Sequence, residues 1–392
     1  MARFDYLIVG GGMTADAAAR GIRELDSSGS IGILSAEPDP PYSRPPLSKS
    51  LWKGESEASI WRETDDAGVT LCSGRTVVDI DPTTRSVTDD RGARHEYGRV
   101  LLATGGTPRP LPFRADGINY FRTVRDYRAL REATERHERF AVLGGGFIGS
   151  EIAAALRMNE KHVTMVVPEQ GIGARVFPPD LARFVTDYYI ARGVDVRTST
   201  LASSVMRAGD GAAIGLSSGE TVSVHGIVAG LGIVPNVSLA APLGAATGDG
   251  IDVDDRLRTS VEGMFAAGDV ARFHSPALGE RIRVEHEDNA LTMGRAAGRS
   301  MAGDDTPYDH LPFFYSDLFD LGYEAVGVLD SRLEIVSDWK DPYREGVTYY
   351  LDRGRVRGVL LWNVWGQVDA ARRLIAEPGP HRAEYLRGRI SG

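Results

Sequence analysis

Cysteine is nearly absent from this sequence, which has a single one, Cys72, among its 392 residues. Enzymes that relay electrons through a redox-active disulfide need two neighbouring thiols, and one thiol cannot perform that exchange. Cys72 ends the apolar stretch Val69–Cys72, so we expect an inert structural residue rather than a reactive thiol. Any electron transfer by this chain must therefore run from a bound group directly to a molecule outside it.

Long apolar runs and an excess of positive charge are also missing. No run approaches the ~20 residues that cross a bilayer, and the net charge of −9 disfavours general binding to nucleic acids or anionic membranes. The predicted first strand, Phe4–Val9, leaves no room for a signal peptide before it. With 42% apolar and 25% charged residues, the composition is that of a globular protein with two or three domains. We expect a cytoplasmic monomer or homodimer.

Glycine, in contrast, is concentrated in two turns of the same pattern. Residues 10–15 read GGGMTA and follow the apolar run Phe4–Val9; residues 144–149 read GGGFIG and follow the run Phe140–Leu143. In a dinucleotide-binding turn, the first glycine permits a tight bend, the second lets the backbone approach a pyrophosphate, and a small third residue lets helix and strand pack closely. Free N–H groups at the helix start then hold the phosphates. These positions are Gly10, Gly12 and Ala15 in the first turn and Gly144, Gly146 and Gly149 in the second.

An acidic residue follows each turn at the spacing of a ribose ligand. Glu37 comes just after the predicted strand Ile31–Ser35, and Glu169 just after the predicted strand His162–Val167. Each lies about 20 residues past its glycines, where a carboxylate binds a ribose 2′-OH. Two such units predict two dinucleotides, as needed for hydride transfer between a nicotinamide and a flavin. Glu169 favours NADH over NADPH because a carboxylate repels a 2′-phosphate, although Arg175 nearby weakens that preference.

The order of predicted elements indicates three domains. A second βαβ unit, from near Arg139 to about Pro235, repeats the first, which indicates an internal duplication. Beyond it the chain returns to the first domain, with a strand over Met264–Val270 and a helix over Glu287–Met301. From Pro312 onward we expect an α+β domain. Further strands are predicted over Arg75–Ile80, Ser86–Thr88, Arg99–Ala103, Tyr323–Leu329, Leu333–Ser337, Val347–Leu351 and Val356–Leu361, and helices over Val368–Ala376 and Arg382–Arg389.

Several motifs occur in a familiar order along essentially the whole chain. The most specific is the proline-rich loop PYSRPPLSK at 41–49, followed by LLATG at 101–105, GLGIVPN at 230–236 and AGDV at 267–270. With these motifs the chain resembles the FAD-dependent ferredoxin reductases of oxygenase systems and apoptosis-inducing factor. The stretches VEHEDNA at 284–290, GYEAVG at 322–327 and GVLLWN at 358–363 are most similar to the apoptosis-inducing-factor branch.

This resemblance implies an α/β fold of the glutathione-reductase-like kind, with two Rossmann-like nucleotide-binding domains and a C-terminal α+β domain. Residues 1–112 and 237–311 would bind FAD, residues 113–236 would bind NAD(H), and residues 312–392 would form one wall of the flavin pocket. The family oxidises NADH or NADPH with noncovalent FAD. The eukaryotic factor's targeting segment has no counterpart here, so a death-signalling role is not implied.

The resemblance also implies roles for residues around FAD. Lys49 would lie beside flavin N5 and stabilise the negative charge that builds as hydride arrives. Glu151 would pair with Lys49 and orient it, because a lone, partly buried charge is costly; the alternative is a solvated lysine and an acid favoured by the helix dipole. Arg44 would contact the pyrophosphate, and Asp269 the ribityl hydroxyls. Other expected FAD contacts are Thr104, Gly105, Gly268, Glu285, His286 and Tyr315.

Two of these contacts, His286 and Tyr315, have plain alternatives. The helix predicted from Glu287 would direct its positive end at flavin N1 and O2. Glu285 would accept from the nicotinamide amide, and His286 would pack on the rings or merely cap the helix. Tyr315, where the eukaryotic factor has a Trp, would cover the flavin edge or serve only in packing. The residues expected on the NAD side are Gly144, Gly146, Gly149, Glu151, Glu169, Arg175 and Gly232, and no metal ligands are expected.

Together these features predict a flavoprotein that accepts hydride from NADH and passes electrons singly to a [2Fe–2S] ferredoxin or similar carrier. An excess of arginine beyond residue 352 would attract an acidic ferredoxin, or would form only a solvated exterior. Two alternatives stay open: an NADH-responsive redox sensor with a long-lived reduced-flavin–NAD⁺ complex, and a reductase of quinones or oxygen. The arginines, set against three acids, are Arg353, Arg355, Arg357, Arg372, Arg373, Arg382, Arg387 and Arg389.

Overall fold

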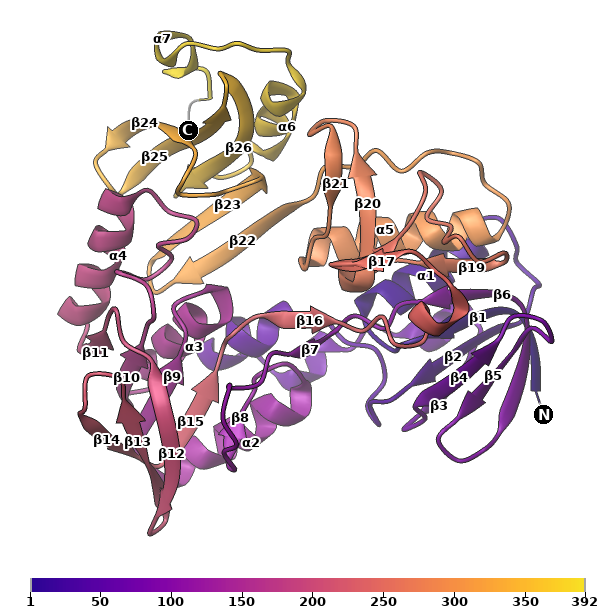
Figure 1. The fold of residues 1–392 in the computed structure, drawn as a ribbon, viewed down its shortest axis with the longest axis horizontal. Helices are drawn as coiled ribbons and strands as arrows, with labels where there is room; N and C mark the ends of the chain where they lie inside the picture. Colours follow the sequence, from indigo (N-terminus) through magenta and orange to yellow (C-terminus); the bar gives the residue numbers. More distant parts are fainter. Residues whose placement is uncertain (1, 391–392) are drawn as a thin grey trace. The chain divides into compact units, whose positions relative to one another are not determined.

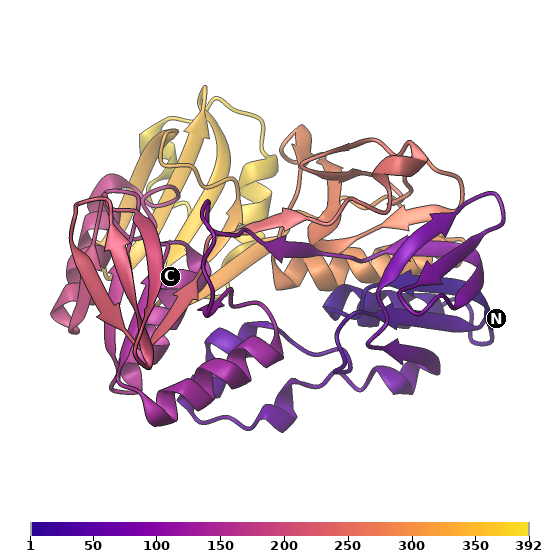
Figure 2. The same ribbon diagram turned by 60° about the horizontal axis from the view of Figure 1, so that its bottom comes forward.

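Short apolar runs form the parallel strands of two separate sheets, one in each of two units of the chain. In this computed structural model, which describes residues 2–390, the first unit comprises Met1–Ser43, Glu57–Thr107 and Val234–Pro312. The second unit comprises Arg44–Ser56, Pro108–Ile233 and Phe313–Gly392. Figure 1 labels the elements of both, and Figure 2 shows the same ribbon after a 60° turn.

The first unit contains a seven-stranded sheet: β1 (Ala2–Val9), β2 (Ile31–Ser35), β3 (Val69–Ser73), β4 (Val77–Asp81), β5 (Ser86–Asp89), β6 (Arg94–Leu102) and β19 (Met264–Ala266). Their order is β3-β2-β1-β6-β5-β4, and β19 pairs with β6. β1, β2, β3, β6 and β19 run parallel, whereas β4 and β5 form an antiparallel extension. Leu7 and Ile8 are fully buried because β1 is a central strand.

Two helices of the first unit, α1 (Met13–Arg23) and α5 (Glu287–Met301), lie side by side and share the core of this sheet. Small residues permit the close approach, since a Cβ on Gly294 or Gly298 would overlap the backbone of α1. A second sheet of the unit has the order β17-β18-β20-β21. Its strands are β17 (Thr247–Gly248), β18 (Gly250–Asp252), β20 (Ala271–Ser275) and β21 (Glu280–Ile282).

The second unit repeats this design on a five-stranded, fully parallel sheet in the order β11-β10-β9-β15-β8. An antiparallel sheet of β12, β13 and β14 shares its core. A capping box of Thr123 and Asp126 begins α2. The strands are β8 (Ile118–Asn119), β9 (Arg139–Leu143), β10 (His162–Val166), β11 (Val194–Arg197), β12 (Ala202–Ala208), β13 (Gly211–Leu216), β14 (Thr221–Val224) and β15 (Gly226–Ala229); the helices are α2 (Val124–Arg136), α3 (Phe147–Met158) and α4 (Pro179–Ala191). Separately, β7 (Gly106–Pro108) and β16 (Ile233–Pro235) pair as a two-stranded sheet.

The C-terminal part of the second unit is an antiparallel sheet in the order β22-β23-β26-β25-β24. Helix α6 packs on β23 and β26, and the sheet and helix are seen together in Figure 1. The elements are β22 (Phe313–Leu318), β23 (Leu321–Gly327), β24 (Glu334–Asp341), β25 (Glu345–Asp352), β26 (Arg355–Trp362), α6 (Val368–Ala376) and α7 (Ala383–Leu386).

From Arg44 onward the proline-rich loop belongs to the second unit, where the chain forms two short 3₁₀ helices, η1 (Pro45–Ser48) and η2 (Ser50–Lys53). Trp52 anchors it. The Trp52 indole N–H donates to the carbonyl of Leu47 at 2.7 Å, and the indole meets the Tyr127 ring edge-on. The Asn159 amide, just after α3, donates to the Trp52 carbonyl at 3.2 Å. The loop is therefore fixed on α2 and α3.

These elements confirm the predicted fold class, and the helices over Glu287–Met301 and Val368–Ala376 have the predicted bounds. Several other predicted bounds differ from the structure, including the following three. The helix over Arg382–Arg389 ends at Leu386, because the N–H of Gly388 bonds the Asp338 carboxylate instead. The strand over Met264–Val270 ends at Ala266, before Gly268 takes a φ of 75° in a 3₁₀ turn, η6 (Gly268–Val270). β6 begins at Arg94 rather than Arg99.

The division into three domains stays a prediction. Within residues 2–390, no helix is both long and apolar enough to cross a membrane.

Candidate functional site

Four predicted FAD-side segments leave the first sheet at one edge. In the parallel register, Val9 of β1 pairs with Leu34 of β2 and with Leu102 of β6. Leu102 in turn pairs with Ala266 of β19. The segments that follow these strand ends contain Gly10–Gly12, Glu37, Thr104–Gly105 and Gly268–Asp269. Ligands of open α/β sheets bind outside the carboxyl ends of the strands, so the register gathers these residues where a dinucleotide is expected.

The first glycine turn has the backbone that a pyrophosphate site needs. Gly10 has a φ of 117°, and a Cβ there would overlap the carbonyl oxygen of Ala103, so only glycine fits without strain. A Cβ on Gly12 would meet no heavy atom within 4 Å. Gly12 is the N-cap of α1 and makes no side-chain cap hydrogen bond. The helix start is therefore bare backbone, which fits the phosphates of a dinucleotide.

Two other predicted residues of the first unit, Glu37 and Thr104, form hydrogen bonds with neutral partners. Glu37 accepts a 2.6 Å hydrogen bond from the Tyr42 hydroxyl. Thr104 donates through its hydroxyl to the Asn236 carbonyl at 2.9 Å, and the Asn236 amide donates back to the Thr104 carbonyl. These bonds connect the LLATG and GLGIVPN motifs, which only the family resemblance had linked.

Arg283 organises the segment before α5. Its guanidinium bonds the Glu285 carboxylate at 2.7 Å and the Asp269 carbonyl at 3.1 Å. His286 is the N-cap of α5 but makes no side-chain cap hydrogen bond. Asp269, Glu285 and His286 thus lie close along one stretch of the first unit, and their roles toward a flavin stay predictions.

The second unit repeats the sheet-edge arrangement. Val166, Leu143 and Ala229 are aligned in β10, β9 and β15, so Glu169, Gly144–Gly146 and the segment up to Gly232 follow adjacent strand ends. Gly144 has a φ of 107°, and a Cβ there would overlap the Gly230 carbonyl oxygen.

The second turn fits a pyrophosphate for the same reasons as the first. Gly146 is the N-cap of α3 without a side-chain cap, and a Cβ there would meet nothing within 4 Å. A Cβ on Gly149 would overlap the Gly144 carbonyl oxygen, as expected where helix and strand pack closely.

Glu169 is not a lone carboxylate. Arg175 Nε lies 2.5 Å from Glu169 Oε1, and the arginine side chain is 81% exposed while that of Glu169 is 23% exposed. The role of this carboxylate toward a ribose stays a prediction, and the neighbouring cation would reduce the repulsion that a 2′-phosphate meets there.

Lys49 and Glu151 form the ion pair that the family resemblance implies. Lys49 Nζ lies 2.5 Å from Glu151 Oε1, and the two side chains are 11% and 3% exposed. Ser316 donates to the same Oε1 at 2.6 Å, and Ser48 donates to Oε2 at 2.6 Å. A buried carboxylate is stable when its charge is paired and its lone pairs are bonded, and here both oxygens are bonded.

Aromatic side chains enclose this cluster. The Lys49 ammonium lies 5.2 Å from the centroid of the Tyr315 ring, a favourable cation–π distance. Burial, and then the negative charge of Glu151, raise the pKa of Tyr189 and of Tyr323 well above the usual value for tyrosine. Both phenols therefore stay neutral, and Lys49 supplies the positive charge that balances Glu151.

Sequence reasoning missed Ser48 and Ser316. Ser48 is adjacent to Lys49 in the proline-rich motif, so its position was a usable signal. Ser316 lies in β22, 165 positions from Glu151, and nothing local in the sequence marks it. Arg44, expected at the pyrophosphate, belongs to the second unit, where its guanidinium donates to the Arg122 carbonyl at 2.7 Å.

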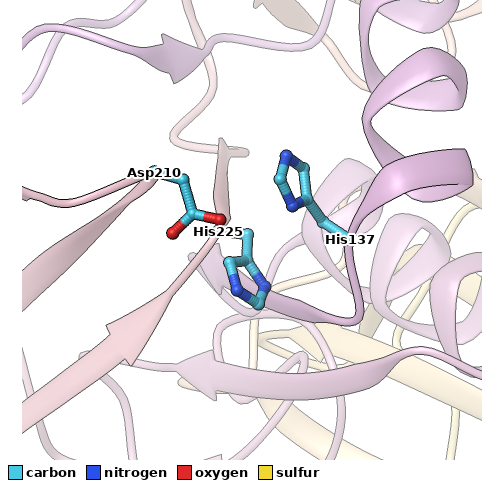
Figure 3. Close-up of side chains that lie close together, drawn as sticks. All are labelled: His137, Asp210 and His225. Carbon is cyan, nitrogen blue, oxygen red and sulfur yellow. The ribbon is translucent and has the colours of Figure 1, made fainter.

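A second cluster of titratable side chains lies elsewhere in the second unit. His137 follows α2, Asp210 lies in the β12–β13 turn, and His225 precedes β15; one ligand atom from each lies within 4.8 Å of the others (Figure 3). The imidazole rings stack at 4.8 Å with 17° between their planes, and His225 Nδ1 accepts the Arg139 N–H at 3.2 Å. Imidazole lone pairs lie in the ring plane, so nearly parallel rings do not converge on one cation. The expectation of no metal stays a prediction.

The C-terminal arginines are partly neutralised. Arg372 bonds Asp369 at 3.1 Å, Arg389 bonds Glu377 at 2.6 Å, and Arg353 lies 3.6 Å from Asp352. The net positive charge near these arginines is thus smaller than their number alone suggests. Attraction of an acidic protein to this part of the chain stays a prediction.

Two family models match this chain. Residues 4–294 match the family described as "Pyridine nucleotide-disulphide oxidoreductase". Residues 297–342 and 337–377 match "Apoptosis-inducing factor, mitochondrion-associated, C-term". The resemblance drawn from the motifs is confirmed.

Individual relatives agree with these matches. "Apoptosis-inducing factor 1, mitochondrial" of Dictyostelium discoideum is 34% identical, over 95% of this chain and 78% of that protein. The "5,5'-dehydrodivanillate O-demethylase ferredoxin reductase subunit" of Sphingobium sp. is 35% identical, over 91% of this chain and 89% of that protein. The putidaredoxin reductase of a covalent putidaredoxin reductase–putidaredoxin complex superposes with a TM-score of 0.89 at 29% identity, covering 96% of this chain and 94% of that one.

Proposed function

Because this chain belongs to the pyridine nucleotide-disulphide oxidoreductase family, and is therefore an NAD(P)H-dependent oxidoreductase with FAD, we propose that it is a ferredoxin reductase. It takes hydride from NADH and delivers electrons singly to a [2Fe–2S] ferredoxin. The ferredoxin reductases among its relatives support this acceptor. The observation that carries the proposal is the nearly buried ion pair of Lys49 and Glu151, in a chain that has two glycine turns of the dinucleotide-binding pattern.

Bound FAD supplies a group that accepts two electrons as hydride and releases them one at a time. The backbone of Gly10–Gly12 would hold its pyrophosphate, and Glu37 its ribose. The backbone of Gly144–Gly146 and the carboxylate of Glu169 would hold and orient NADH in the same way. Residues 113–236 would thus serve as the NAD(H)-binding domain.

Lys49 would stabilise the negative charge that grows during hydride transfer. Glu151 fixes the direction of the ammonium, because the two side chains are ion-paired and nearly excluded from water. A single cysteine leaves no disulfide relay, so the acceptor must take electrons from the flavin itself. We propose NADH rather than NADPH on the position of Glu169, with Arg175 limiting the preference.

The test is anaerobic stopped-flow mixing of the yellow holoprotein with NADH, followed by steady-state reduction of cytochrome c. We expect flavin bleaching by NADH and rapid cytochrome c reduction only when a [2Fe–2S] ferredoxin is added. A purified chain without flavin, or a flavin indifferent to both NADH and NADPH, would overturn the proposal. Turnover with quinone or oxygen and no protein acceptor would replace it with a small-molecule reductase.

The C-terminal match and the Dictyostelium relative support a second candidate, an NADH-responsive redox sensor. In that case reduction is slow, and a long-wavelength charge-transfer band persists for minutes in air. A band that decays within the turnover time argues against the sensor.

A further inference from the structure

We propose that Ser48 and Ser316 are positioning residues for hydride transfer, acting through Glu151 on Lys49. This inference rests on the proposed function. Each hydroxyl donates a 2.6 Å hydrogen bond to a different oxygen of the Glu151 carboxylate. Neither serine is expected to contact a nucleotide, because the hydroxyl hydrogen of each is donated to Glu151.

The first step of the argument is the direction of the carboxylate. Lys49 Nζ and Ser316 Oγ share Oε1, at 2.5 and 2.6 Å, and Ser48 Oγ binds Oε2. A carboxylate bonded at both oxygens cannot rotate about its last torsion without breaking one of these bonds. The serines therefore fix the point in space to which the ammonium is drawn.

The second step is the balance of charge. The side chains of Glu151 and Ser316 are nearly or fully buried, whereas Lys49 keeps 11% of its side chain exposed. The two other titratable groups whose pKa responds to Glu151, Tyr189 and Tyr323, are held neutral by burial. Among these groups one negative charge faces one positive charge, and two hydroxyl dipoles stabilise the negative one.

The third step is the chain connectivity. Ser48 and Lys49 are consecutive, so the proline-rich loop grips both oxygens of one carboxylate. Ser316 arrives on β22 of the C-terminal sheet, beside Tyr315, whose ring lies under the ammonium. The alignment of Lys49 thus depends on a strand that is remote in sequence from both nucleotide turns.

The experiment measures the rate of flavin reduction at saturating NADH, the apparent Kd for NADH, the flavin content and the melting temperature. We expect Ser48→Ala and Ser316→Ala each to slow reduction about tenfold, the size of one hydrogen bond to a charged group. The Kd for NADH and the flavin content stay at the wild-type values. Ser337→Ala is the matched control, because the Ser337 hydroxyl lies in the same sheet and forms a 3.1 Å hydrogen bond with the Thr348 hydroxyl.

A double-mutant cycle separates positioning from mere packing. If the serines act through the carboxylate, adding Ser316→Ala to Glu151→Gln slows reduction no further. Additive losses, or a tenfold loss in Ser337→Ala as well, would overturn the inference. If Ser316→Ala does not fold, the Ser48→Ala and Glu151→Gln cycle, on the opposite oxygen, decides the question. A wild-type flavin that NADH cannot reduce would instead defeat the proposed function, and that result is visible before any variant is made.

Discussion

The two glycine turns share a backbone conformation, but the buried acid in the helix that follows each turn has different partners. At both turns a glycine with positive φ passes close to a neighbouring carbonyl, and a second glycine opens a helix with no side-chain cap. Asp16 in α1 is fully buried and bonds Arg62 at 2.7 Å and the Thr64 hydroxyl at 2.9 Å. Glu151 in α3, one position later relative to its turn, bonds Lys49 and two serines.

This difference teaches that a repeated backbone need not repeat chemistry. Asp16 fastens a loop of its own unit, including Arg62, onto the helix. Glu151 instead directs a cation that keeps some access to solvent. If the two turns each hold a dinucleotide, as we propose, then a shift of one residue along the helix separates an acid that fastens a loop from one that orients a lysine.

The largest expected effect comes from adding a side chain at the first glycine of each turn. Gly10→Ala introduces a Cβ that overlaps the Ala103 carbonyl at a strained φ, so we expect a chain that no longer retains FAD, measured by flavin absorbance after desalting. Gly144→Ala should keep its flavin and bind NADH at least about tenfold more weakly. Gly54→Ala is the control, since Gly54 also has positive φ but no close neighbour. Full flavin retention in Gly10→Ala would contradict the proposal that the first turn holds FAD as the second turn holds NADH.

The next effect separates the two buried acids. Glu151→Gln keeps shape and removes charge, so we expect flavin reduction to slow about 10²-fold with flavin still bound. Asp16→Asn leaves Arg62 without its anion, so we expect a loss of about 3 kcal/mol in the free energy of unfolding, measured by urea denaturation. Its reduction rate should match the wild type. Equal slowing by both variants would remove the distinction drawn between the acids.

Lys49→Ala tests the cation directly. We expect slower hydride transfer at an unchanged Kd for NADH, measured by anaerobic stopped flow, because the charge matters only as negative charge builds. Lys53→Ala, four residues on and paired with Asp317 at 3.1 Å, is the exposed-lysine control. A wild-type rate in Lys49→Ala would refute its role.

Smaller effects are expected at the second ribose acid. Glu169→Ala should raise the KM for NADH about tenfold with flavin still bound, since one charged hydrogen bond is lost. Arg175→Ala should lower the relative use of NADPH a few-fold, because it unmasks the Glu169 charge. Both are measured as kcat/KM with each nucleotide, and Arg332→Ala, an exposed arginine paired with Asp330, serves as control. Unchanged kinetics in Glu169→Ala would remove it from the ribose site.

The smallest effect is expected at Cys72. Burial raises the pKa of its thiol, so a smaller fraction is thiolate at a given pH and reaction with an aromatic disulfide reagent should be slower than for a free thiol. Its rate should rise as pH increases past the ordinary thiol range. Cys72→Ser should leave flavin reduction unchanged. A loss of activity in that variant would reinstate sulfur chemistry.

Much of the fold could be predicted because apolar periodicity and glycine turns are local signals. The bounds of α5 were predicted from the spacing of its apolar and small residues, and the predicted bounds of α6 and of β2 (Ile31–Ser35) also agree with the structure. β22 was missed because Phe313, Phe314 and Tyr315 are consecutive aromatics, so no alternation shows which face is inside. The first half of β6 was missed because its residues are polar, and backbone pairing with β1 and β5 holds them in the sheet.

The candidate site was predictable only where one segment carries it. The glycines, Glu37 and Glu169 stand at fixed spacings along one βαβ unit, and Lys49–Glu151 followed from family resemblance. Ser316 was not predictable, because a buried serine satisfied by a carboxylate 165 positions away leaves no local pattern.

The spacing of the Glu151 partners has a consequence for synthesis. Ser48 lies 103 positions before the glutamate and Ser316 lies 165 after it, so the ribosome must release three distant stretches before this carboxylate is fully bonded. A nascent chain that stops short of β22 would carry an incompletely bonded charge in its interior, and cellular proteases remove such chains preferentially. In a pulse-chase comparison, a product ending at Pro312 should disappear faster than the complete polypeptide. Full bonding of this carboxylate would then depend on completed synthesis of β22.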